Sequence, residues 1–155
     1  DYTGVDLLEF THSDFAQANR VERLAFRYRI PALAQRVGDY LILNLPNVSL
    51  EVSEVGRSDR QHPLWWKGTN AEELEVTLTV PKGFEVYAAG RKASTRGKGW
   101  RLDAAFSTSG QVVRFADAWE RSALEAPRSA YSEYRKALIA RSRLREAIII
   151  LKHKR

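Results

Sequence analysis

The chain has 155 residues, of which 44% are hydrophobic and 28% are charged, a composition that predicts one folded domain with a sizeable core and argues against disorder. It contains no cysteine, which excludes disulfides, thiolate metal ligands and a cysteine nucleophile within these residues. The longest aliphatic run near the end, residues 147–151, is far shorter than the roughly 20 residues of a membrane-spanning helix. The chain begins with Asp1 and has no methionine, so we expect it to belong to a longer polypeptide.

The basic residues are concentrated in the C-terminal half. The formal net charge is +6. Residues 79–155 carry 17 basic and 7 acidic side chains, whereas residues 1–78 carry 8 basic and 12 acidic ones. Such clustering could attract phosphate-rich partners.

The first half of the chain predicts several short strands. Residues 1–19 are interpreted as a connecting segment, and residues 20–155 as a single domain. In residues 23–30, large apolar side chains alternate with basic or small ones, which is typical of a half-buried strand with a basic outer face. Two further strands are predicted in VGDYLILNLP, residues 37–46, and in VSLEV, residues 48–52.

The middle of the chain shows the clearest period of two. In residues 73–80, leucine and valine alternate with glutamate and threonine, and the run ends at the turn sequence PKG. Residues 84–87 are predicted as the next strand. The polar residues 90–99, punctuated by glycines, are interpreted as a basic hairpin loop, and they lack the spacing of a phosphate-binding loop. Alternation in residues 100–106 and 113–119 then predicts a hairpin.

The period changes near the end of the chain, where Ser129 is predicted to cap a helix. Residues of one arc of this helix recur at helical spacing and are expected to be buried: Tyr131, Tyr134 and Leu138. Basic residues fall largely on another arc and are expected to be displayed: Arg128, Arg135, Lys136 and Arg143. Residues 147–151 predict a last strand. The fold is therefore predicted to be mainly β, an antiparallel β-sandwich with one C-terminal α-helix followed by a short final strand.

No reaction is recognisable in the sequence. The three histidines, His12, His62 and His153, lie far apart and show no ligand spacing, so no metal site is expected. His62, beside Pro63, is interpreted as a residue at the solvent edge. No nucleophile elbow occurs. We therefore predict no catalytic residue, no metal and no cofactor.

Adjacent tryptophans suggest a possible binding surface. If Trp65 and Trp66 lie in an extended segment, their side chains point to opposite faces, so one indole is expected in the core and the other outside. The outer ring could contact a carbohydrate or a peptide, although simple packing explains most tryptophans. Together with the basic helix, the residues of the candidate binding surface are Trp65, Trp66, Arg135, Lys136 and Arg143.

Three stretches, in order, carry a family resemblance. They are an arginine followed by proline and leucine (Arg60, Pro63, Leu64), a strand ending in proline-x-glycine (Pro81, Gly83), and a tyrosine-bearing helix followed by an aliphatic strand with lysine (Tyr131, Ile149, Leu151, Lys152). The chain resembles, over roughly residues 20–152, the C-terminal β-sandwich domain of bacterial transglutaminase-like proteins, a domain of unknown function that follows the transglutaminase core. The helix of this chain is richer in arginine than that pattern.

The resemblance implies an extracytoplasmic or cell-envelope protein. The catalytic cysteine, histidine and aspartate of such proteins belong to the central core, so no catalytic role is carried over to this chain. We expect a non-catalytic accessory domain whose partner is the catalytic domain of the same parent chain. The alternative is an independent binding module that uses the basic C-terminal half on anionic polymers, nucleic acid or envelope phosphates, with no specific nucleic acid expected.

Overall fold

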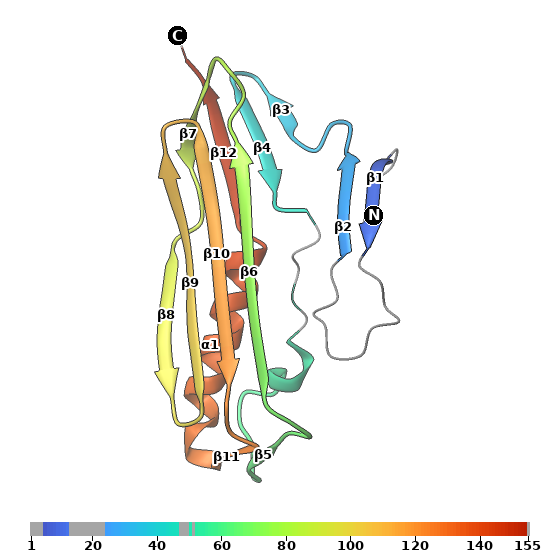
Figure 1. The fold of residues 1–155 in the computed structure, drawn as a ribbon. Helices are drawn as coiled ribbons and strands as arrows, with labels where there is room; N and C mark the ends of the chain where they lie inside the picture. The colour runs from blue at the N-terminus through green and yellow to red at the C-terminus, as the bar shows by residue number, and fades with distance from the viewer. Residues whose placement is uncertain (1–4, 13–23, 47–49, 51, 155) are drawn as a thin grey trace. The chain divides into compact units, whose positions relative to one another are not determined.

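The computed structural model describes residues 5–12, 24–46, 50 and 52–154 (Figure 1). The chain forms two compact units, residues 1–35 and 36–155. This division differs from the predicted one, which placed a connecting segment in residues 1–19. Among the described residues, no helix is long and apolar enough to cross a membrane.

The N-terminal unit contains an antiparallel pair of strands, β1 (Asp6–His12) and β2 (Leu24–Arg29). Part of the predicted connecting segment is therefore a strand. Phe10 lies opposite Phe26, with ring centroids 5.1 Å apart. The strand predicted in residues 23–30 is present, but Phe26 is 57% exposed rather than half-buried. A two-stranded ribbon by itself has no second layer in which to bury such side chains.

The main sheet of the larger unit has the strand order β6-β10-β9-β8, and every neighbouring pair is antiparallel. Its strands are β6 (Asn70–Thr79), β8 (Lys92–Gly97), β9 (Trp100–Ser109) and β10 (Val112–Arg121). The predicted hairpin is confirmed as β9 and β10, in which Phe106 lies opposite Phe115. Side chains alternate across each strand, so one face of the sheet is buried.

Strand β8 corrects one prediction. Residues 90–99 were expected to form a loop, but residues 92–97 pair with β9, and a tight turn at Lys98 and Gly99 joins the two strands. The segment is polar in composition because it is an edge strand whose outer face is exposed. The exposed residues of this face are Lys92, Ser94 and Arg96. Gly97 has no room for a side chain, since an added Cβ would collide with the Trp100 indole.

A second sheet has the order β3-β4-β12-β7, with β3 (Gln35–Val37), β4 (Tyr40–Asn44), β7 (Phe84–Ala88) and β12 (Ile148–His153). The predicted final strand is confirmed as β12, whose Ile149 and Leu151 are buried. The strand expected in residues 48–52 lies largely outside the described residues, and Leu50 and Val52 belong to no strand. A 3-10 turn, η1 (Ser53–Val55), follows.

The helix α1 (Tyr131–Arg145) comes after a short two-stranded sheet, β5 (Leu64–Trp65) with β11 (Glu125–Ala126), and a 3-10 turn, η2 (Arg128–Ala130). Ser129 is therefore not the helix cap, because Ala130 holds that position without a side-chain hydrogen bond. Figure 1 shows α1 and the β12 sheet lying behind the same face of the main sheet. The predicted class is confirmed: a mainly β, antiparallel fold with one C-terminal helix and a final strand.

Candidate binding surface around residues 54–66

An aromatic cluster supports this surface from inside the domain. Tyr134 of α1 is completely buried, and its ring centroid lies 5.2 Å from that of Trp66, 6.0 Å from Trp100 and 5.7 Å from Trp119. Burial raises the pKa of the Tyr134 phenol well above its usual value, and the nearby Glu54 carboxylate adds to this increase. The phenol is therefore a permanent hydrogen-bond donor in the folded protein.

Glu54 fastens the turn η1 to this cluster. The Tyr134 hydroxyl donates to Glu54 Oε1 at 2.9 Å, and Trp66 Nε1 donates to Glu54 Oε2 at 3.1 Å. Arg135 Nε donates to the carbonyl of Val55 at 3.0 Å, and the Val55 side chain is buried. Hydrogen bonds to a charged group are among the stronger ones in proteins, so η1 is held firmly against α1.

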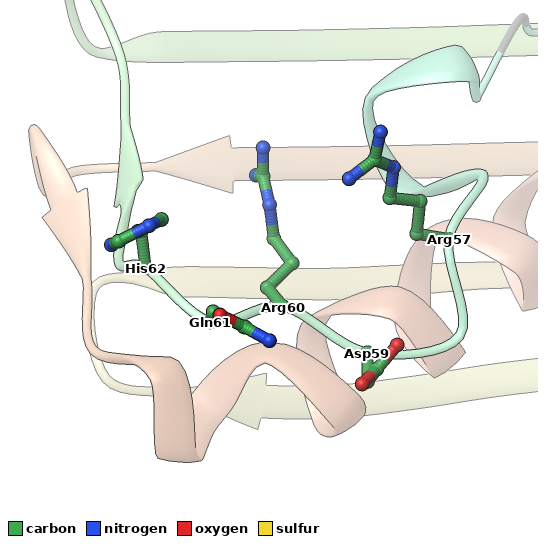
Figure 2. A pocket seen from close by; sticks show the side chains of 5 residues that line it. All are labelled: Arg57, Asp59, Arg60, Gln61 and His62. Carbon is green, nitrogen blue, oxygen red and sulfur yellow. The ribbon is translucent and has the colours of Figure 1, made fainter.

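The loop that follows η1 lines a pocket of about 340 Å³ with five polar or charged residues: Arg57, Asp59, Arg60, Gln61 and His62 (Figure 2). Its backbone is anchored by the Tyr131 hydroxyl, which donates to the carbonyl of Arg57 at 2.7 Å. The Arg60 guanidinium carbon lies 5.7 Å from the centroid of the Tyr131 ring. Figure 2 shows the side chains of Arg57 and Arg60 extending in the same direction, whereas the Asp59 carboxylate points away from them.

The two adjacent tryptophans separate as the alternation predicts. Trp65 is 72% exposed, whereas Trp66 is half-buried and packs on Tyr134. The Arg121 guanidinium carbon lies 4.7 Å from the centroid of the Trp66 ring. The backbone of Trp66 donates to the carbonyl of Leu124 at 2.9 Å, and Leu124 is also exposed. The exposed indole therefore lies on β5, and the exposed leucine lies in the bend just before β11.

The predicted basic residues of the helix do not form one surface with the tryptophans. Lys136 and Arg143 are exposed as expected, and Lys136 lines a separate groove against β8. Arg135 is only half-exposed, because its Nε atom bonds to the η1 backbone. Of the candidate residues, Trp65 and Trp66 belong to the segment 54–66, and Arg135 contacts it through the Val55 carbonyl.

A buried ionic cluster, which the sequence reasoning missed, joins α1 to the main sheet. Its members are Asp117 of β10, Glu72 of β6, and Arg141 and Arg145 of α1. Asp117, Arg141 and Arg145 are 1%, 2% and 6% exposed. The signal was present in the alternation of β10, where Asp117 stands between the inward-facing Phe115 and Trp119.

The three histidines stay apart. His62 lines the loop pocket, His153 packs edge-on against Phe84, and His12 lies beside Phe10. Within the described part of the chain, no three His, Cys, Asp or Glu side chains come close enough to hold a metal ion.

Comparisons with known proteins bear on the fold alone. No protein-family model and no curated protein matches the sequence. The fold is similar to part of the crystal structure of a "putative protease" from Parabacteroides distasonis, with a TM-score of 0.59 and 14% sequence identity. The match covers 73% of this chain and 23% of the other, so this chain corresponds to less than a quarter of that protein.

Proposed function

We propose that this chain is a non-catalytic accessory domain of a larger transglutaminase-like protein and that it packs beside the catalytic core. The observation that supports this most directly is the surface around residues 54–66. There an exposed guanidinium, Arg57, lies on a loop that α1 holds in place, and an exposed indole, Trp65, lies on the short strand β5 that follows this loop. Tryptophan and arginine are the residues that most often anchor protein interfaces, and a firmly held loop loses little entropy on binding.

Two further observations agree with this proposal. A similar fold makes up 23% of the larger Parabacteroides distasonis protein, so a fold of this kind occurs as one part of a longer chain. The motifs around Arg60, Pro81 and Tyr131 resemble the tail domain of transglutaminase-like proteins. The same resemblance supports an extracytoplasmic or cell-envelope location.

The alternative, binding of anionic polymers by the basic C-terminal half, receives less support. Arg141 and Arg145 contribute to the count of basic residues, but both are buried and paired with Asp117 and Glu72. The exposed cations of the helix are thus fewer than the sequence suggests. We expect weak binding of polyanions that disappears near physiological salt.

The test uses the full reading frame that encodes this chain. We expect it to encode a cysteine, histidine and aspartate core as well, and we expect removal of residues 36–155 to lower the melting temperature of that core or to raise its KM. Trp65→Ala in the full-length protein should reproduce part of this effect. Tyr87→Ala is the matched control, because Tyr87 is an aromatic residue of similar exposure, 62%, on the second sheet. A reading frame without a catalytic core would contradict the proposal.

A further inference from the structure

Within the part of the chain that the structure describes, Arg57 and Arg60 line one pocket without a carboxylate partner, unlike the arginines of the ion pairs described above. Arg101, Arg114, Arg141 and Arg145 each form an ion pair. Among the described residues, neither Arg57 nor Arg60 pairs with a carboxylate, although both line the same pocket. Figure 2 shows the two side chains extending from one loop in the same direction.

The position of this pocket is fixed by the fold. Val55 is buried immediately before the loop, the Tyr131 hydroxyl holds the carbonyl of Arg57, and Arg60 lies over the Tyr131 ring. Leu64, directly after the loop, is also buried. Because both ends are anchored, a ligand meets the two arginines with little cost in loop entropy.

The chemistry of the lining favours a carboxylate. A guanidinium presents two N–H groups that match the two oxygens of a carboxylate or of a phosphate. Asp59 belongs to the same lining, so the two arginines and the one aspartate together carry a formal charge of +1. This balance suits one carboxylate better than a phosphate dianion or a polyanion. The volume of about 340 Å³ is at the small end for ligand sites, which suits a side chain.

We propose that this pocket binds a glutamate or aspartate side chain of an acidic peptide segment that also presents an apolar side chain to Trp65. Trp65 follows His62 by three residues and is 72% exposed on β5, next to the loop that lines the pocket. Acidic and apolar groups of one extended segment could therefore be recognised together. The inference rests on the proposed function in that it treats the domain as a binding partner, and it adds the chemistry of the segment that is bound.

The experiment measures binding of a short capped peptide of alternating glutamate and leucine to the 155-residue chain at physiological salt, by calorimetry. The matched peptide replaces glutamate with glutamine, and inorganic phosphate and polyphosphate form separate arms. We expect only the acidic peptide to bind. Arg57→Ala should weaken binding at least about tenfold, since a charge-assisted hydrogen bond is lost. The side chain of Arg57 makes no contact that the fold requires among the described residues, so this variant should melt at the parent temperature.

Two other variants locate the site. Arg60→Lys keeps the charge but loses the planar fork, so it should also weaken binding. The double variant Lys136→Ala with Arg143→Ala removes exposed cations elsewhere and should leave binding unchanged. The inference is wrong if the glutamine peptide binds as tightly as the acidic peptide, or if the acidic peptide does not bind at about 1 mM. It is also wrong if the chain prefers phosphate or polyphosphate to the acidic peptide, or if only the Lys136 and Arg143 double variant loses peptide binding. These outcomes concern the pocket alone, whereas the reading frame and the deletion test the proposed function.

Discussion

Asp117 of strand β10 and Arg141 of helix α1 form a buried ion pair in which Arg141 Nε lies 3.0 Å from each carboxylate oxygen. Arg145 Nε, one helical turn further on, donates to Asp117 Oδ2 at 2.6 Å. Glu72, on the neighbouring edge strand, pairs with both arginines where the cluster meets solvent. Three charges are thus taken out of water at the contact between the helix and the sheet, and each is matched by an opposite charge.

The first prediction concerns removal of the central carboxylate. Asp117→Ala leaves two buried guanidinium groups with Glu72 as their remaining carboxylate among the described residues, and an uncompensated buried charge is costly. We expect the free energy of unfolding to fall by about 3 to 5 kcal/mol, as measured by urea denaturation. Asp103→Ala is the control, because Asp103 forms an exposed pair with Arg101 and its loss should change little. Similar losses in both variants would contradict a structural role for the buried cluster.

The second prediction concerns acid. Burial raises the pKa of Glu72, but hydrogen bonds and charges from Arg145 and Arg141 outweigh it and hold this pKa below its ordinary value of 4.5. Glu72 therefore binds a proton more readily in the unfolded chain than in the folded one. Its contribution to stability is complete above the unfolded pKa and is lost as the pH falls through the lower, folded pKa.

Urea denaturation from about pH 7 to about pH 3 checks this expectation. Part of the acid-induced loss of stability should disappear in Glu72→Gln. Glu73→Gln, one residue along the same strand, should keep the parent's pH dependence, because Glu73 is exposed on the outer face. The idea fails if the two variants show the same response to acid.

Alternation in the sequence predicted the positions of most strands because side-chain direction in a strand depends only on local geometry. Apart from the hairpin of β9 and β10, it did not predict which strands pair. β6 joins β10, whereas β7, the next strand along the chain, joins β12 in the other sheet, and such long-range partners are fixed by packing. It also missed β8, because a polar edge strand and a polar loop have similar compositions.

The candidate surface was only partly predictable. The separation of Trp65 and Trp66 follows from the period of two, but the loop pocket depends on contacts with a helix that comes about 70 residues later. Tyr131 was predicted as a buried helical residue, yet nothing in its spacing indicates that its hydroxyl fixes the carbonyl of Arg57. Arg141 and Arg145 were counted among the basic residues of the C-terminal half, and only their burial shows that they belong to the core.

The third prediction concerns the hydroxyl of Tyr134. Tyr134→Phe keeps the aromatic packing but removes the donor to Glu54, so the turn η1 loses one of the bonds that hold it to α1. We expect a loss of about 1 to 2 kcal/mol in the free energy of unfolding. Tyr87→Phe is the control, since Tyr87 is exposed. An unchanged stability of Tyr134→Phe would mean that water replaces the phenol at Glu54 without cost.

The last prediction separates the roles of the two adjacent tryptophans. Trp66→Ala removes the contact with Tyr134, the hydrogen bond to Glu54 and the stacking of Arg121, so we expect it to cost about 2 to 4 kcal/mol, less than a fully buried tryptophan would. Trp65→Ala removes an exposed side chain and should change the stability of the isolated chain by no more than about 0.5 kcal/mol.

In partner binding we expect the opposite order, with Trp65→Ala causing the larger loss of affinity. If Trp65 anchors the contact with the catalytic core, Trp65→Ala should weaken association of the two parts at least about tenfold while leaving the urea midpoint of this chain in place. Titration calorimetry of the separately expressed parts, compared with urea denaturation of each variant, measures both quantities. Stability losses of equal size in Trp65→Ala and Trp66→Ala would show that the outer indole is part of the core, and the interface would then have to lie elsewhere.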